Sequence, residues 1–138
     1  MTEAVAGTEE PVGATVPLAP LSVLVIDDDP DVRAFIVNSL EDHGYRVREA
    51  SDGRQGLAAL ERETPDLVVL DFIMPGLSGA DVARQIRAKR PEQPILFVSG
   101  YSETEAIKRT APDAPLLAKP FRAEALHKAV RGALTAAG

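Results

Sequence analysis

LSVLVIDDDP, residues 21–30, joins a short apolar run to three consecutive aspartates and a proline. This pattern is typical of a buried strand that leads directly into a helix, because Asp caps helix starts and Pro fits the first helical turn. Three later apolar runs also end at single polar residues, namely Asp71, Ser99 and Lys119. Parallel strands share one sheet edge at their carboxyl ends, so these polar residues are expected to meet in one site.

Strand and helix patterns alternate from the first of these runs onward. Strands are expected at about 21–27, 45–50, 66–71 and 94–99, with a short fifth strand after Pro115, helices in the intervals and a fifth helix after the last strand. Ser102 and Glu105 are expected to cap the fourth helix. The alternation predicts an α/β fold with a doubly wound, five-stranded parallel sheet. We expect the flavodoxin-like strand order 2-1-3-4-5, with helices on both faces.

Composition limits the domain organisation and the classes of function. Residues 21–138 are expected to form one domain, and residues 1–20 a disordered tail or linker, because they lack apolar periodicity. A formal net charge of −6 argues against binding to nucleic acid or to a membrane surface, and no cysteine is present. No signal peptide or membrane-spanning run is found, so the expected location is cytoplasmic. His43 and His127 have no evident partner and are expected on helix surfaces.

Asp27, Asp28 and Asp71 form the centre of the expected site. Carboxylates crowded within a few ångströms repel one another, and no Lys or Arg adjoins the first two in sequence. A hard divalent cation would offset this repulsion, and Mg²⁺ prefers carboxylates together with water and phosphate oxygens. A strand end followed by a helix cap explains Asp29, but it does not explain the other acids. The sequence therefore predicts a Mg²⁺ site.

Asp71 is also the expected nucleophile, because an aspartate can accept a phosphoryl group as an acyl phosphate. Lys119 and the metal would offset the charge that develops on the phosphoryl oxygens. Ser99 offers a hydroxyl to the same oxygens, and Gly100 offers an unhindered backbone N–H. The Lys119–Pro120 bond follows a strand directly and is compatible with a cis peptide that aims the lysine inward.

Four motifs give the chain a resemblance to the receiver domain of two-component response regulators, over about residues 21–136. They are VIDDDP at 25–30, DFIMPGLSG at 71–79, VSG at 98–100 and KPF at 119–121. The resemblance implies that Asp71 is the phosphoacceptor. It implies that a sensor histidine kinase or a histidine phosphotransfer protein donates the phosphoryl group from a phosphohistidine. The chain would then be a regulator that catalyses only its own phosphorylation and dephosphorylation.

The same resemblance implies a set of metal ligands. Asp28, Asp71 and the backbone carbonyl of Ile73 would bind Mg²⁺ directly. Asp27 would bind it mainly through water.

Switching is implied to run through Ser99, Gly100 and Tyr101, while Lys119 pairs with the phosphoryl group. The output would be altered binding of a downstream protein, still unknown, at the face formed by helix 4, strand 5 and helix 5. Many receivers carry an aromatic residue three positions before the lysine, and Leu116 stands there in this chain. The aromatic Tyr101, just after the switch residues, is therefore the expected substitute.

Several classes of protein remain as alternatives. A single-domain response regulator or phosphorelay shuttle is the first interpretation, because no output domain follows before Gly138. The receiver segment of a hybrid histidine kinase is the second, with residues 1–20 as a linker. A haloacid-dehalogenase-like phosphatase shares the Asp27-x-Asp29 spacing but needs a late acidic pair and a cap insertion. A flavodoxin-like FMN carrier would need a phosphate loop in place of the acids, and a structural adaptor would need no reactive Asp71.

Overall fold

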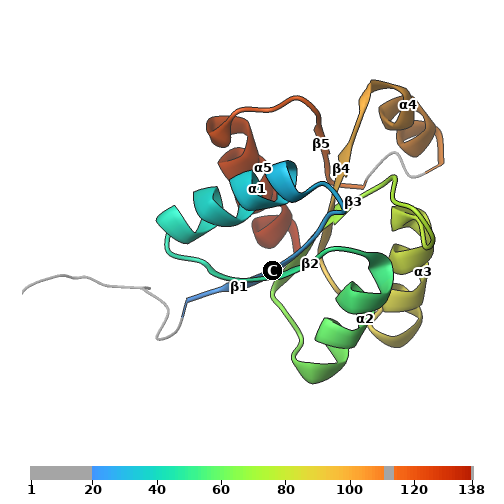
Figure 1. Ribbon diagram of the computed structural model, residues 1–138, viewed down its shortest axis with the longest axis horizontal. Coiled ribbons are helices and arrows are strands. Elements are labelled where there is room, and N and C mark those ends of the chain that lie inside the picture. Colours follow the sequence, from blue (N-terminus) through green and yellow to red (C-terminus); the bar gives the residue numbers. More distant parts are fainter. Residues whose placement is uncertain (1–19, 111–113, 138) are drawn as a thin grey trace, which may run out of the picture.

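The computed structural model describes residues 20–110 and 114–137, in which strands and helices alternate (Figure 1). In chain order the elements are β1 (Ser22–Ile26), α1 (Pro30–Asp42), β2 (Arg46–Ala50), α2 (Gly53–Arg62), β3 (Leu67–Asp71), α3 (Gly79–Lys89), β4 (Ile95–Ser99), α4 (Tyr101–Thr110), β5 (Leu116–Ala118) and α5 (Ala123–Ala137). The tail expected at 1–20 falls almost wholly outside the described residues. Among the described helices, none has the length and apolar character needed to cross a lipid bilayer.

The strands form one parallel sheet in the order β2-β1-β3-β4-β5, which confirms the predicted topology. The register of the central pairs aligns the carboxyl ends of the strands. Asp71, the last residue of β3, is opposite Val98 of β4. Ser99, the last residue of β4, is opposite Ala118 of β5. The polar residues that follow the apolar runs therefore lie along the same edge of the sheet.

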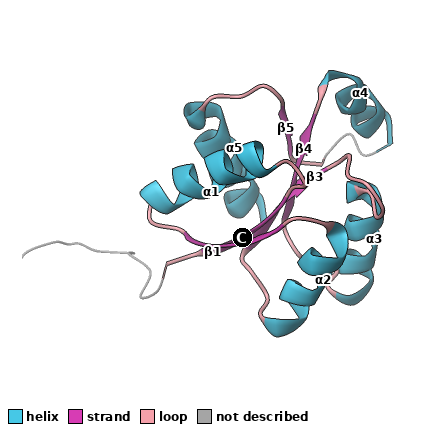
Figure 2. Cartoon of the chain, viewed as in Figure 1, coloured by secondary structure: helices cyan, strands magenta, loops and turns pink. Residues whose placement is uncertain are grey.

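Helices cover both faces of the sheet, as Figure 2 shows. α1 and α5 pack on one face, and α2, α3 and α4 pack on the other. Successive residues of a strand point to opposite faces, so Val23 and Val25 join the cluster under α1 and α5. Leu24 and Ile26 join the cluster under the other three helices. A strand covered on both sides must be apolar throughout, which explains the uninterrupted apolar runs in the sequence.

The start of α1 forms as the sequence predicts. The Asp29 side chain accepts hydrogen bonds from the backbone N–H groups of Asp31 and Val32, and Pro30 occupies the first helical turn. Gly44 follows the helix with a φ of 89°, a left-handed conformation that favours glycine. The Asp29 cap fixes the direction in which the chain leaves the acidic end of β1.

The start of α4 differs from the prediction, because the helix begins at Tyr101 and not after a cap at Ser102. The backbone N–H of Thr104 donates to the Gly100 carbonyl at 3.1 Å, which makes Gly100 the capping residue. The Glu103 side chain reaches back and accepts the Gly100 N–H at 2.7 Å. A glutamate three residues after the cap stabilises a helix start in this way, so Glu103 and not Glu105 is the capping acid.

Candidate functional site

Three carboxylates meet at the carboxyl edge of the sheet. Asp27 and Asp28 follow β1 directly, and Asp71 ends β3, the neighbouring strand. One carboxylate oxygen from each residue lies within 4.8 Å of the others. Asp27 and Asp71 are almost fully buried, at 1% and 4% exposure, whereas Asp28 is exposed. The structure thus brings together the three acids that the sequence predicts for a metal site.

Among the described residues, only one oxygen of the Asp27 carboxylate accepts a hydrogen bond. Its Oδ1 accepts the backbone N–H of Asp29 at 2.9 Å. Its Oδ2 is buried and has no hydrogen-bond partner among the described residues. Arg33 fixes the backbone nearby, because its Nη1 donates to the Asp27 carbonyl at 2.7 Å while its Nε contacts Glu49 at 2.9 Å. Sequence reasoning missed Arg33, which looks like any charged residue of an amphipathic helix.

Lys119 brings a positive charge to the acids from the end of β5. Its Nζ lies 3.5 Å from Oδ1 of Asp71 and 3.9 Å from Oδ2 of Asp27. The peptide bond between Lys119 and Pro120 is cis. One ammonium therefore lies within ion-pair distance of two buried carboxylates.

Burial, and after it the nearby Asp27 charge, raise the pKa of the Asp71 carboxyl to about 7, although the Lys119 charge opposes both effects. Burial also raises the pKa of Asp27, against the Asp29 hydrogen bond and the Lys119 charge, which both lower it. One ammonium does not offset the cost of placing these charges out of water. Binding of a proton or a cation would therefore stabilise the site.

The donor set fits a magnesium ion. The ligand atoms of Asp27, Asp28 and Asp71 are all carboxylate oxygens, which a hard divalent cation prefers. The buried Oδ2 of Asp27 is an acceptor still without a hydrogen-bond partner among the described residues. A cation or an ordered water would satisfy such an atom. Ile73, the third expected direct ligand, lies two residues after Asp71 with a side chain 55% exposed.

Gly79 keeps the loop after Asp71 close to the sheet. Its backbone N–H donates to the Phe72 carbonyl at 2.8 Å. A Cβ at position 79 would lie 2.3 Å from the backbone oxygen of Asp71, which no real side chain could accept. The glycine at the end of the DFIMPGLSG motif therefore allows α3 to start against the backbone of Asp71 and Phe72.

The expected switch residues lie at the end of β4 and on β5. Ser99 is fully buried, and its Oγ lies 2.8 Å from Oγ1 of Thr104. Leu116 is half-buried and opposite Phe97 in the sheet register. The Tyr101 side chain is outside the described part of the structure. Sequence analysis missed Thr104, whose only signal is its position one turn after Gly100.

His43 and His127 correct the prediction that they have no partner, because they contact each other, although His43 is exposed as expected. Their rings stack with centroids 3.4 Å apart and link the end of α1 to α5. His127 is half-buried, and its Nδ1 has no hydrogen-bond partner among the described residues. The two positions are far apart in sequence, so no local pattern indicates the contact.

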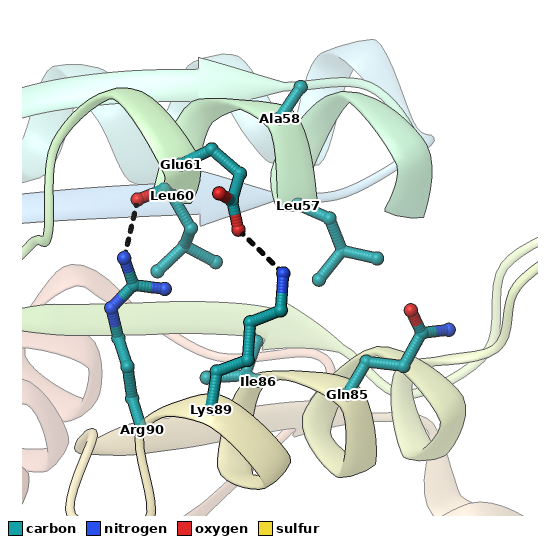
Figure 3. Close-up of a pocket in the computed structure, with 8 residues that line it drawn as sticks. All are labelled: Leu57, Ala58, Leu60, Glu61, Gln85, Ile86, Lys89 and Arg90. Atoms are coloured by element: carbon teal, nitrogen blue, oxygen red, sulfur yellow. Dashed lines mark hydrogen bonds and ion pairs between the residues drawn. The ribbon is translucent and has the colours of Figure 1, made fainter.

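Of two hollows in the described part of the structure, one adjoins the acidic site and the other does not. Figure 3 shows one of about 210 Å³ between α2 and α3, crossed by the ion pair of Lys89 and Glu61 at 3.0 Å. It contains none of the three carboxylates. The other, of about 310 Å³, adjoins the site through Lys119 and is otherwise lined by Asp31, Val32, Phe35, Pro120 and Phe121. The second hollow therefore offers an apolar surface beside the reactive edge.

Comparison with curated proteins gives relatives across most of the chain. It is 40% identical to the response regulator MprA of Mycolicibacterium vanbaalenii over 118 residues, which is 83% of the chain and 51% of the relative. It is 33% identical to the probable transcriptional regulatory protein TcrX of Mycobacterium tuberculosis over 121 residues, 86% of the chain and 52% of the relative. The chain thus spans about half the length of these curated relatives.

Solved structures and the family match agree with these relatives. The receiver domain of NtrX from Brucella abortus has a TM-score of 0.76 at 33% identity, covering 82% of the chain and 98% of that structure. Residues 23–131 match the response regulator receiver domain. Members of this family typically carry phosphate on an aspartate, bind Mg²⁺ and act with a sensor kinase or a phosphotransfer partner. The chain belongs to the receiver domain family of two-component response regulators.

Proposed function

We propose that this receiver accepts a phosphoryl group from a phosphohistidine on Asp71 and changes its binding to a downstream protein. One observation carries the proposal. The buried Asp71 carboxylate faces two further carboxylates within 4.8 Å and the ammonium of Lys119 at 3.5 Å. This arrangement supplies a nucleophile, a cation site and a positive charge at the position where phosphoryl oxygens would lie.

Asp28, Asp71 and the Ile73 carbonyl would hold the Mg²⁺ ion directly, and Asp27 would hold it mainly through water. When bound, Mg²⁺ neutralises carboxylate charge and stabilises the negative charge on the transferred phosphoryl oxygens. The same neutralisation keeps Asp71 ionised near neutral pH, although its pKa without metal is about 7.

In the proposed transfer, a carboxylate oxygen of Asp71 attacks the phosphorus atom of the phosphohistidine. An O–P bond forms, the N–P bond breaks, and the donor imidazole leaves with the electron pair of that bond. Lys119 pairs with a phosphoryl oxygen, because its ammonium already lies beside Asp71. The product is an acyl phosphate on Asp71, and its later hydrolysis returns the carboxylate.

The donor protein would approach along the apolar hollow of about 310 Å³ that adjoins Lys119. Phe35 is 43% exposed, and its ring lies 6.0 Å from that of Phe121. Exposed aromatic surface beside a reactive group is typical of a protein-binding site. We infer that a sensor histidine kinase or a histidine phosphotransfer protein docks there and presents its phosphohistidine to Asp71.

Phosphorylation would act on partners through Ser99, Gly100 and Tyr101, toward the face formed by α4, β5 and α5. Leu116 has no planar ring that could turn between the interior and the surface. The loop into α4 is therefore the proposed route of the signal.

Two architectures fit this activity: a single-domain regulator or phosphorelay shuttle, and the receiver segment of a hybrid histidine kinase. A shuttle would take phosphate rapidly from a separate kinase and pass it to a separate acceptor. A hybrid segment would prefer the kinase of its own chain. Transfer rates from a panel of purified phosphorylated kinases would distinguish these two alternatives.

The function is tested by incubating the chain with Mg²⁺ and a small acyl phosphate, followed by intact-mass measurement. The native chain should gain one phosphoryl group, and Asp71→Asn should gain none. Asp52→Asn is the matched control, because Asn caps α2 as well as Asp does and position 52 is the cap of that helix. Phosphorylation that survives in Asp71→Asn, or steady turnover of a phosphate ester, would contradict the proposal.

A further inference from the structure

The Ser99 hydroxyl is already engaged by a residue of α4. Its Oγ lies 2.8 Å from Oγ1 of Thr104, in the first turn of α4. Thr104 donates its own hydroxyl hydrogen to the Gly100 carbonyl at 2.9 Å. A hydroxyl has a single hydrogen, so Ser99 must be the donor in the Ser99–Thr104 bond. The only hydrogen that Ser99 could offer to a phosphoryl oxygen is therefore committed to α4.

The backbone N–H of Gly100 is committed in the same way. It donates to Oε1 of Glu103 at 2.7 Å. A Cβ at position 100 would lie 2.5 Å from that oxygen, so the absence of a side chain permits the approach. The Ser99 hydroxyl and the Gly100 N–H, two hydrogen-bond donors at the end of β4, are thus held by Thr104 and Glu103. These two residues are consecutive in the first turn of α4.

We propose that Glu103 and Thr104 are positioning residues that form an inactive-state latch, and that a phosphoryl group on Asp71 competes with them for the Gly100 N–H and the Ser99 hydroxyl. The proposal rests on Asp71 being the phosphoacceptor and extends that function to its regulation. It identifies the first turn of α4 as the part of the molecule that changes when the site is phosphorylated.

The competition follows from charge and from hydrogen-bond number. A phosphoryl group is a stronger acceptor than the Thr104 hydroxyl, because its oxygens carry charge. When Ser99 turns toward it, Thr104 Oγ1 loses its donor. When the Gly100 N–H turns as well, the Glu103 carboxylate loses its cap contact and is left near a second anion that repels it.

The expected consequence is a population shift in α4 and not a movement of the sheet. Ile107, in the next turn of α4, is 2% exposed and packs in the cluster on that face of the sheet. The latch holds the first turn, while this apolar contact anchors the helix below it. Release of the latch therefore frees the end of α4 nearest to the site. This change needs no rotating aromatic residue, and position 116 carries a leucine.

The test measures binding of beryllofluoride, a phosphoryl mimic, to the full chain at saturating Mg²⁺ by NMR titration. Thr104→Val removes the hydroxyl, and Glu103→Ala frees the Gly100 N–H. Each variant should bind the mimic about two- to tenfold more tightly, the range expected when one competing hydrogen bond is lost. The Gly100 amide resonance of each free variant should also shift toward its position in the mimic-bound protein.

Matched controls separate the latch from general effects on helices. Thr104→Ser keeps the hydroxyl and should bind the mimic as the native chain does. Thr135→Val removes a similar bond, from a threonine hydroxyl to the carbonyl four residues earlier at 2.8 Å, but in α5. Glu105→Ala removes an exposed acid from the same helix. Thr135→Val and Glu105→Ala should both leave the affinity for beryllofluoride unchanged.

A double-mutant cycle with Ser99→Ala gives the decisive comparison. If Thr104 acts through the Ser99 hydroxyl, Thr104→Val should produce no further gain in affinity once that hydroxyl is absent. An equal gain in both backgrounds, or native or weaker affinity in Thr104→Val alone, would overturn the latch.

These outcomes are distinguishable from failure of the proposed function. If the native chain does not bind beryllofluoride, or if Asp71→Asn binds it equally well, Asp71 is not the phosphoacceptor and the latch falls with it. If the native chain binds and Asp71→Asn does not, the function stands, and the Thr104 and Glu103 variants alone decide the latch.

Discussion

The Nζ of Lys119 lies 3.5 Å from Oδ1 of Asp71, although their strands do not touch. β4 separates β3 from β5 in the sheet, so the long lysine side chain reaches across the end of β4 to contact the acid. The same ammonium lies 3.9 Å from Asp27. Lys119 therefore joins the reactive edge to the strand that leads into α5.

Lys119→Met should separate metal binding from the response to phosphate. Mg²⁺ needs only the carboxylates, so its affinity should stay within a few-fold of native or increase, because a competing positive charge is lost. Beryllofluoride affinity should fall by about tenfold or more, since one charge-assisted hydrogen bond is lost. NMR titrations with each ligand measure both effects.

Lys128→Met serves as the control, because Lys128 is an exposed lysine on α5. It should change neither affinity. A Lys119→Met chain that bound beryllofluoride as the native chain does would make Lys119 an ordinary surface residue.

Asp28 and Asp27 should differ in their importance for Mg²⁺ binding. Asp28→Ala removes an exposed carboxylate that we infer to be a direct ligand, and saturable binding should be lost. Asp27→Ala removes an acid inferred to act through water, so binding should weaken but still saturate. Isothermal titration with Mg²⁺ measures the difference, and equal native affinity in both variants would exclude this site.

The pKa of Asp71 predicts an effect on stability in metal-free buffer. Burial and the nearby Asp27 charge raise this pKa from 3.8 to about 7, so the folded chain binds this proton more tightly than the unfolded chain does. The Asp71 contribution to the free energy of unfolding is therefore present at low pH and is lost as the pH rises from about 4 to about 7.

Asp71→Asn should consequently stabilise the metal-free chain at pH 8 by roughly 2–4 kcal/mol and have little effect at pH 4. Urea denaturation in the presence of a chelator measures both values. Saturating Mg²⁺ should reverse the order at pH 8, because the native acids gain a bound cation and the variant does not. A variant less stable than the native chain at pH 8 without metal would contradict the raised pKa.

The sequence predicted the sheet order and the meeting of Asp27, Asp28, Asp71 and Lys119, because both follow from local features. An apolar run indicates a buried strand, and the ligand-binding residues of a parallel sheet lie at the carboxyl ends of its strands. The helix start at Asp29 was also predictable, since the capping residue and the helix are adjacent in the chain.

Contacts that depend on three-dimensional packing were not predictable in this way. The cap of α4 was misassigned because Ser102 is a favourable capping residue in isolation, whereas Gly100 has no side chain to signal its role. The hydroxyl pair of Ser99 and Thr104 depends on how α4 leaves β4. The His43–His127 stack depends on how α1 packs against α5, which sequence periodicity does not specify.

The His43–His127 stack predicts a second pH effect, opposite in sign to that of Asp71. Burial lowers the pKa of His127 below 6.5, and the facing charges of His43 and Arg131 lower it further. The negative charges of Glu124 on α5 and Asp42 on α1 oppose this shift. The unfolded chain therefore binds a proton at His127 more tightly than the folded chain does, and the His127 contribution to stability is lost as the pH falls through 6.5.

His127→Phe isolates this contribution. Phenylalanine keeps a flat ring for the stack but cannot take a proton, and the Nδ1 that it removes has no hydrogen-bond partner among the described residues. The native chain should lose more stability than the variant between pH 7.5 and pH 5, as measured by urea denaturation at saturating Mg²⁺. The acids contribute equally to both proteins, so the difference between them reports His127 together with its interaction with His43. Parallel curves over this range would contradict the lowered pKa of His127.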